Sequence, residues 1–207
     1  MDPTPSTSNQ STPLENFINE LLKIDDFEVL ATLLNENIDH DELGCSVLRI
    51  ITMLPERMKT QNPSLSKNVP LLSPESILPA ALADALSIPP FAEDAFDAIY
   101  NLLSYHPLDS ILFRAHQSFL LSAGLLPVAV SVFDPEYLSE IEPSSYSDVI
   151  ESGLDAIELL IHNHPIAQQE FHQLRMTESF IHFHQMISSN PSCLSDDAGA
   201  LLTSLCK

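Results

Sequence analysis

Five histidines in the second half of the chain are the side chains whose type and spacing most suggest chemistry. They are His162, His164, His172, His182 and His184, all within 23 residues. Neutral imidazole is a common metal ligand, so the cluster first suggests a metal site. The spacing argues against one, because histidines two residues apart point to different faces of a helix, and no Asp or Cys completes a cluster three or four residues from either pair. We expect no metal site.

Other catalytic patterns are missing from the sequence. It contains no nucleophile motif, zinc-protease signature or phosphate-binding glycine loop, and it has only 4 glycines. The pairs Asp25-Asp26 and Asp196-Asp197 stand at predicted helix starts, where carboxylates cap free N–H groups. His106 and His164 each precede a proline, which favours a role in the turn or as a cap on the carbonyls of the preceding helix. We expect no enzyme activity and no cofactor.

The charge of the chain limits its partners. Eight Lys and Arg stand against 29 Asp and Glu, which gives a net charge of −21, and after Lys67 only Arg114, Arg175 and Lys207 are basic. Such a surface repels phosphate backbones and anionic lipids, so we expect neither nucleic acid nor membrane as a direct partner. A basic or mixed basic and apolar protein segment is the complementary partner. The sequence does not indicate the oligomeric state.

Cysteine usage and the first residues predict a location. Cys45, Cys193 and Cys206 are odd in number and widely spaced, which fits neither a disulfide framework nor a zinc site. The segment MDPTPSTSNQSTP lacks the regions of a signal peptide, and no apolar run reaches the roughly 18 residues of a membrane helix. We expect a cytoplasmic protein, with the nucleus as the alternative.

The elements that position these side chains are predicted from apolar residues at helical spacing. Residues 1–13 are rich in Ser, Thr and Pro, so we expect a disordered tail followed by one repeat domain over 14–207. Pro55 is expected to end the third helix and begin a basic loop insert over 55–74, and residues 134–147 are expected to form an acidic loop insert. The predicted helices cover about 14–22, 27–34, 41–54, 77–86, 91–105, 111–121, 126–133, 148–162, two runs within 165–187, and a last helix after Ser195.

An internal repeat relates these helices. FDAIYNLLSYHP (96–107) matches LDAIELLIHNHP (154–165) at an offset of 58, and Phe113 recurs as Phe171 at the same offset. Leu78, Pro79 and Ala81 recur as Leu126, Pro127 and Ala129. Helices grouped in threes then begin their third member near residues 41, 92, 148 and 196.

These motifs, with HPIAQQEFHQL (164–174) and SAGLLPVAV (122–130), resemble armadillo repeats, and the resemblance extends from Leu14 to Cys206. It implies an all-α fold, a right-handed α-solenoid of about four armadillo-like three-helix units. Armadillo proteins that carry nuclear-import cargo use a ladder of Trp and Asn on their third helices. This chain has no Trp, and Asn101 matches the Asn position once while Leu159 replaces it in the next unit, which argues against such an adaptor.

The resemblance to a binding fold and the lack of a catalytic motif predict a non-catalytic scaffold or adaptor that presents an acidic groove to a peptide or protein. Two alternatives stay open. One is a nucleotide-exchange co-chaperone of the Hsp70 type, since armadillo folds occur among such short, acidic proteins, and the other is a regulatory subunit of a larger complex.

The groove is expected on the third helices, which line the concave face of such a solenoid. The alternatives are that these positions form an ordinary solvated face, and that the partner binds the basic loop from Arg57 to Lys67. The candidate groove residues are Asp94, Asp97, Tyr100, Asn101, Tyr105, Glu151, Asp155, Glu158 and His162.

Overall fold

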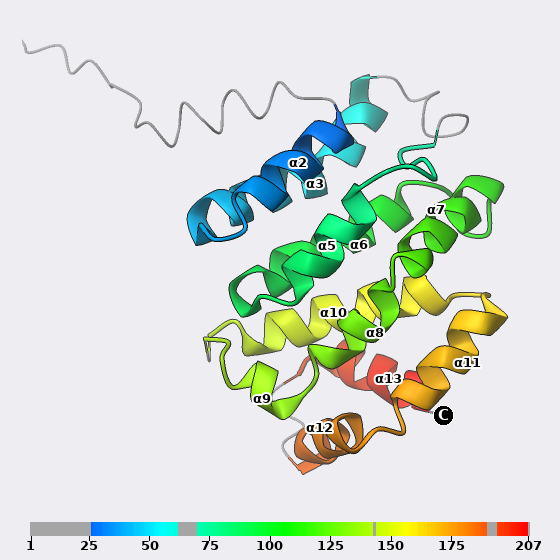
Figure 1. Cartoon of the computed structure of the whole chain (residues 1–207). Helices are drawn as coiled ribbons and strands as arrows, with labels where there is room; N and C mark the ends of the chain where they lie inside the picture. The colour runs from blue at the N-terminus through cyan, green and yellow to red at the C-terminus, as the bar shows by residue number, and fades with distance from the viewer. Residues whose placement is uncertain (1–25, 62–69, 143, 190–193, 207) are drawn as a thin grey trace, which may run out of the picture.

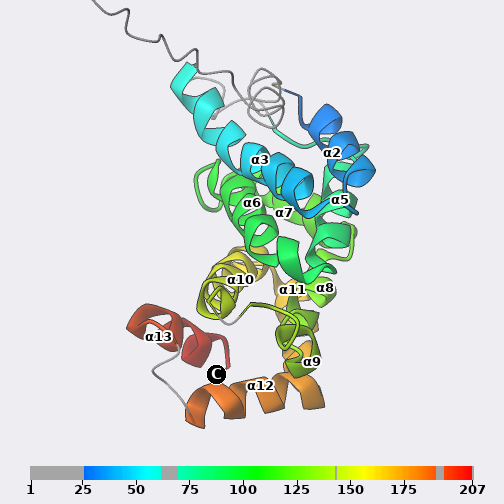
Figure 2. The ribbon, with the colours of Figure 1, turned by 90° about the vertical axis from the view of Figure 1, so that its left-hand side faces the viewer.

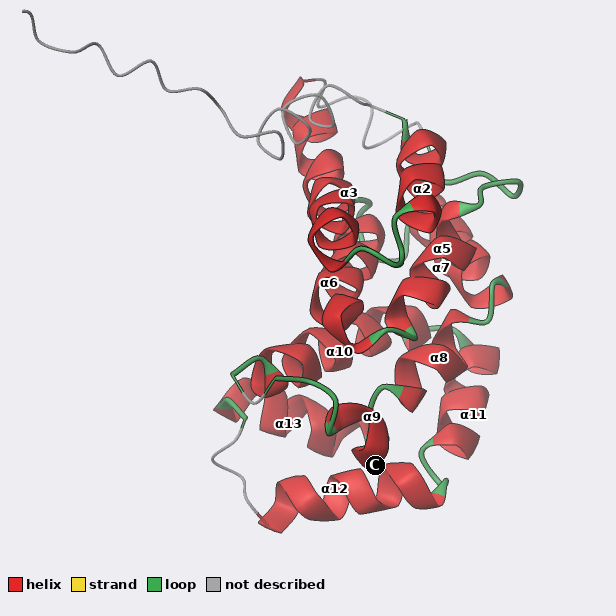
Figure 3. Ribbon diagram, turned by 60° about the vertical axis from the view of Figure 1, so that its left-hand side comes forward, coloured by secondary structure: helices red, strands yellow, loops and turns green. Residues whose placement is uncertain are grey.

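A computed structural model of the chain describes residues 26–61, 70–142, 144–189 and 194–206, and in these ranges every regular element is a helix (Figure 3). The predicted tail over 1–13 and the predicted helix over 14–22 lie outside the described residues. The elements are α2 (Phe27–Glu36), α3 (Asp41–Gln61), α5 (Leu78–Leu86), η1 (Pro89–Phe91), α6 (Ala92–Ser104), α7 (Ile111–Ser122), α8 (Leu125–Ser131), α9 (Pro135–Leu138), α10 (Tyr146–Ile161), α11 (Pro165–Leu174), α12 (Glu178–Ser189) and α13 (Asp196–Leu205).

The helices stack in rows that follow the order of the chain. Helices α3, α6, α10 and α13 form one row, in which each member packs against the next (Figure 2). Helices α2, α5 and α8 form a second row beside it, and Figure 1 shows the pairs α2 with α3 and α5 with α6 following one another. Helices α7 and α11 pack on α8 and α10. The helices that the sequence pattern assigned as third members, α3, α6, α10 and α13, are therefore neighbours in space.

In the core between the rows, aromatic rings pack directly against two glycines. A Cβ at Gly44 on α3 would lie 2.5 Å from the Phe91 ring, and a Cβ at Gly153 on α10 would lie 2.9 Å from both Phe96 and Phe133. Phe96 and Phe133 stack with their ring centroids 6.5 Å apart. A larger residue at either glycine would force these buried rings aside, so the two glycines set how closely neighbouring helices approach.

The predicted cap at Asp26 is confirmed, and Ser195 caps the last helix directly before Asp196-Asp197. The Asp26 carboxylate accepts from the N–H of Glu28 at 2.9 Å and begins α2, and the Ser195 hydroxyl accepts from the N–H of Ala198 at 3.2 Å and begins α13. Pro79 lies in the first turn of α5, where its missing N–H has no helical partner to lose.

The prediction that Pro55 ends the third helix is wrong. Helix α3 continues through Pro55 to Gln61, so the first part of the expected 55–74 loop is helical. Pro55 is buried with its neighbours Ile51 and Leu54. Burial of this apolar stripe offsets the backbone hydrogen bond that proline removes. Residues 62–69 lie outside the described part of the chain.

The expected loop over 134–147 is also only partly a loop. It contains α9 and the start of α10, and Asp134 caps α9 by accepting from the N–H of Glu136 at 2.9 Å. The Tyr137 hydroxyl donates to the carbonyl of Leu86 at 2.6 Å, and Leu138 is buried. A helix of four residues is too short to show an apolar period, so the sequence pattern did not indicate it.

Candidate binding face

Carboxylates line up along α10 because of their helical spacing. Asp148, Glu151, Asp155 and Glu158 are separated by three, four and three residues, so they share one side of the helix over about 15 Å. Helix α6 packs against α10 and contributes further acidic residues. We define the acidic face as Glu93, Asp94 and Asp97 on α6 together with Asp148, Glu151, Asp155 and Glu158 on α10. Glu93 and Asp148 were not among the predicted groove residues.

Three of these carboxylates also join neighbouring helices of the row. The Arg49 Nε on α3 donates to Asp94 Oδ1 at 3.1 Å, and the Ser152 hydroxyl on α10 donates to Asp97 Oδ1 at 2.9 Å. The N–H of Ser195, at the start of α13, donates to Glu151 Oε1 at 2.7 Å. Asp94, Asp97 and Glu151 therefore help to fix the helix stack and still carry negative charge at its surface.

The pKa values of Asp97 and Asp155 are raised because these two carboxylates are partly desolvated and lie near other negative charges. Burial raises the pKa of Asp97, and Asp94 adds to the rise, while the hydrogen bond from Ser152 opposes it. Burial, followed by the charges of Glu158, Glu151 and Asp97, raises the pKa of Asp155.

The same effect reaches the amino-terminal end of the face. The pKa of Glu93 is raised by burial first and then by Asp148, Asp94 and Asp97, while Arg49 lowers it. Carboxylates from the two helices therefore repel one another across the α6–α10 seam. A cation placed there would relieve this repulsion.

The remaining predicted groove residues divide into two groups. Tyr100 is 41% exposed on α6, and the Asn101 side chain donates to the backbone carbonyl of Asp97 at 2.9 Å. Tyr105 is 2% exposed, with Lys59 Nζ lying 5.2 Å from its ring centroid, so the prediction that Tyr105 faces the groove is wrong. Its position at the end of α6 turns the ring into the core.

His162 also lies apart from the acidic face. It follows the last residue of α10, where its ring packs edge-on against Phe113 at 6.1 Å between centroids. Its Nε2 lies 3.5 Å from Asp109, whose carboxylate also accepts from the Asn163 side chain at 3.0 Å. His162 therefore belongs to the corner between α10 and α11, and we place it outside the binding face.

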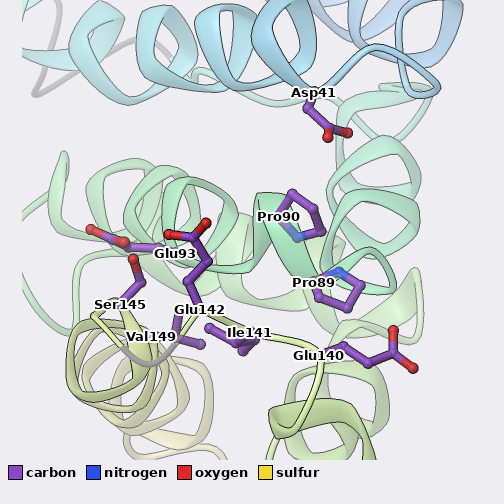
Figure 4. A pocket seen from close by; sticks show the side chains of 9 residues that line it. All are labelled: Asp41, Pro89, Pro90, Glu93, Glu140, Ile141, Glu142, Ser145 and Val149. Carbon is purple, nitrogen blue, oxygen red and sulfur yellow. The ribbon is translucent and has the colours of Figure 1, made fainter.

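A pocket opens beside the amino-terminal end of the face (Figure 4). It has a volume of about 320 Å³ and lies where the amino-terminal ends of α3, α6 and α10 meet the segment before α10. Glu93 belongs to both the pocket and the acidic face. The pocket was not predictable from local sequence patterns, because its lining comes from separate segments. The lining residues are Asp41, Pro89, Pro90, Glu93, Glu140, Ile141, Glu142, Ser145 and Val149.

Two buried polar residues of α7 were also missed. His116 is 0% exposed, and its Nε2 accepts from the N–H groups of Leu71 and Leu72 at 2.9 and 3.3 Å. Burial, with a smaller effect of His106, lowers the pKa of His116 to about 4. Gln117 donates to the carbonyls of Leu159, Leu160 and His162 and so closes the end of α10.

His116 and Gln117 have a structural role, since their polar atoms satisfy backbone groups of adjacent segments. A sequence signal for His116 existed, because it follows buried Phe113 by three residues and precedes buried Leu120 by four.

His164 caps a different helix from the one we expected. Its Nδ1 accepts from the N–H of Ala167 at 3.1 Å, so it caps the start of α11 and not the end of the preceding helix. Its extended backbone, before Pro165, places the imidazole over the free N–H groups of the next helix.

No group of three or more His, Cys, Asp or Glu side chains in the described ranges could hold a metal ion. Cys45 and Cys206 are free thiols. No single described helix is long and apolar enough to cross a membrane; α7 and α8 pass that test only as a pair, and they are bent by 68° at the break between them.

Comparisons with protein-family models, curated proteins and solved structures found no match for this chain. The geometry and charge of the candidate binding face are therefore the observations from which its role is inferred.

Proposed function

We propose that this chain is a right-handed, armadillo-like solenoid of about four three-helix units. The support is the row α3, α6, α10 and α13, whose members are third helices in the sequence repeat and pack in succession. Two of the bonds between row members span similar sequence separations, with Arg49 to Asp94 at 45 residues and Glu151 to Ser195 at 44. The third, from Asp97 to Ser152, spans 55 residues, and the segment 134–147 lies within that interval. Similar separations are what stacked units of one kind produce, apart from inserts.

We further propose that the protein is a non-catalytic scaffold whose acidic face binds a basic, or mixed basic and apolar, segment of a protein partner. The observation that carries this proposal is the crowding of carboxylates across the α6–α10 seam. Neither α6 nor α10 contains a Lys or Arg that could neutralise them. Like charges on one helix face reduce its stability by about 0.2–0.5 kcal/mol a pair. A cationic partner would turn this repulsion into attraction.

A binding titration tests the proposal. A fluorescein-labelled nonaarginine peptide is titrated with the wild type, with a face variant (Asp97→Asn, Asp155→Asn, Glu158→Gln) and with a matched control (Glu136→Gln, Glu170→Gln, Glu178→Gln). The control removes the same charge from exposed positions on α9, α11 and α12. Asn at position 97 retains an oxygen that can accept from Ser152.

We expect fluorescence anisotropy to show binding that the face variant weakens about tenfold or more and the control weakens far less, because exposed charges beyond about 10 Å are screened. Equal weakening by the two variants would show a general charge effect and would contradict a defined binding face.

A further inference from the structure

One cation of the chain already occupies part of the acidic face. Arg49 extends from α3 to α6, where its Nε lies 3.1 Å from Asp94 Oδ1. The Arg49 side chain is 71% exposed, whereas that of Asp94 is 18% exposed. The partly buried partner is thus the carboxylate, and the cation reaches it from solvent.

Arg49 and Lys59 differ in their ion-pair partners. The three cations of α3, α6, α10 and α13 all lie on α3, at Arg49, Arg57 and Lys59. Lys59 lies 3.8 Å from Glu56 on its own helix and over the Tyr105 ring. Arg49 forms its ion pair with Asp94, a carboxylate of the acidic face.

The bond between Arg49 and Asp94 is easy to replace. Arg49 donates to one carboxylate oxygen through Nε, and an ion pair whose cation lies in solvent contributes little because the long side chain loses rotamer freedom. A pocket lined by Pro90 and by Glu93, the residue before Asp94, opens beside the same end of α6. A long cationic side chain could lay its methylene stem against the prolines and place its head near Asp94.

We propose that Arg49 is an internal competitor, which holds Asp94 in the free protein until a cationic side chain of the bound partner takes its place. This inference builds on the proposed function, since it concerns the same face. It predicts that the partner contains an arginine or lysine at the end of its segment that lies nearest α3, and that removal of Arg49 strengthens binding.

The test uses the full chain and the labelled nonaarginine peptide, with Arg49→Met compared with Lys59→Met. Both variants remove one positive charge from α3, so a general change in net charge affects them alike. We expect Arg49→Met to bind the peptide about two- to fivefold more tightly than the wild type, which is the effect of removing one weak competing ion pair. Lys59→Met should change affinity by clearly less, because Lys59 holds no carboxylate of the face.

A second comparison isolates Asp94. In an Asp94→Asn background, the gain from Arg49→Met should disappear, because no carboxylate is left to be vacated. Equal gains from Arg49→Met and Lys59→Met, or a gain that persists with Asn at position 94, would overturn the inference and leave the binding face intact. A wild type that binds no peptide would overturn the proposed function itself.

Discussion

His116 holds the segment before α5 through its ring, so its replacement should destabilise the whole fold. In His116→Leu, the N–H groups of Leu71 and Leu72 both lose their acceptor. Leu72 is buried, with 1% of its surface exposed, and Leu71 is half-buried. Leucine has a similar volume and leaves no cavity large enough for a water to replace the imidazole nitrogen. The perturbation is therefore the loss of two hydrogen bonds.

The cost can be worked from these two groups. A buried backbone N–H left without an acceptor costs about 1–3 kcal/mol, and the half-buried one adds about 1 kcal/mol because water reaches it in part. We expect the free energy of unfolding of H116L to fall by about 2–4 kcal/mol. Urea unfolding followed by circular dichroism measures this fall, with His172→Leu at an exposed position as the matched control.

The ionisation of His116 should also make the stability of the protein depend on pH. Burial lowers the pKa of His116 from its ordinary value of 6.5 to about 4, so the fold favours the neutral ring. The stabilisation is complete above pH 6.5 and is lost as the pH falls toward 4, because the unfolded chain then binds a proton that the native chain excludes. Between pH 7 and 5 this group should reduce wild-type stability by about 2 kcal/mol.

H116L lacks this ionisation, so the difference in stability between wild type and variant should shrink by the same amount over that range. Comparing the two proteins cancels the carboxylates that both share. An unchanged unfolding midpoint in H116L at pH 7, or a difference that does not depend on pH, would refute the role assigned to the imidazole.

Two further predictions concern the core and the binding face. Gly153→Ala should reduce the free energy of unfolding by about 1–3 kcal/mol, because its Cβ would lie 2.9 Å from Phe133, whereas Gly199→Ala, with open space at its Cβ, should not destabilise in the same thermal melt. Binding of nonaarginine should weaken as the pH is lowered from 7 toward 4, because the raised pKa values of Asp97 and Asp155 make these carboxylates take up protons earlier than ordinary ones; an anisotropy titration with constant affinity over that range would contradict this.

The helices and their packing partners were predictable where apolar residues keep helical spacing over many residues. The match between Asp97 and Asp155 at an offset of 58 indicated equivalent helices, and α6 and α10 do pack together. The acidic side of α10 also follows from spacing alone, since residues three or four apart share a face.

The features that could not be predicted from the sequence depend on contacts between distant segments. Pro55 is tolerated inside α3 because of the core it packs into, and Tyr105 is buried with Lys59 of α3 over its ring. The acceptor role of His116 depends on Leu71 and Leu72, 44 or 45 residues earlier, which no local pattern reveals. The pocket beside Glu93 likewise appears only when four segments meet.

The measurement that tests the central claim most directly is a peptide titration followed residue by residue in the amide spectrum of the isotope-labelled chain. If the acidic face binds cationic segments, nonaarginine will shift the amide signals of residues 93–101 on α6 and 148–158 on α10 before any others. Shifts that begin on α3 near the basic residues Arg57 and Lys59, or that spread evenly over all exposed carboxylates, would contradict the claim.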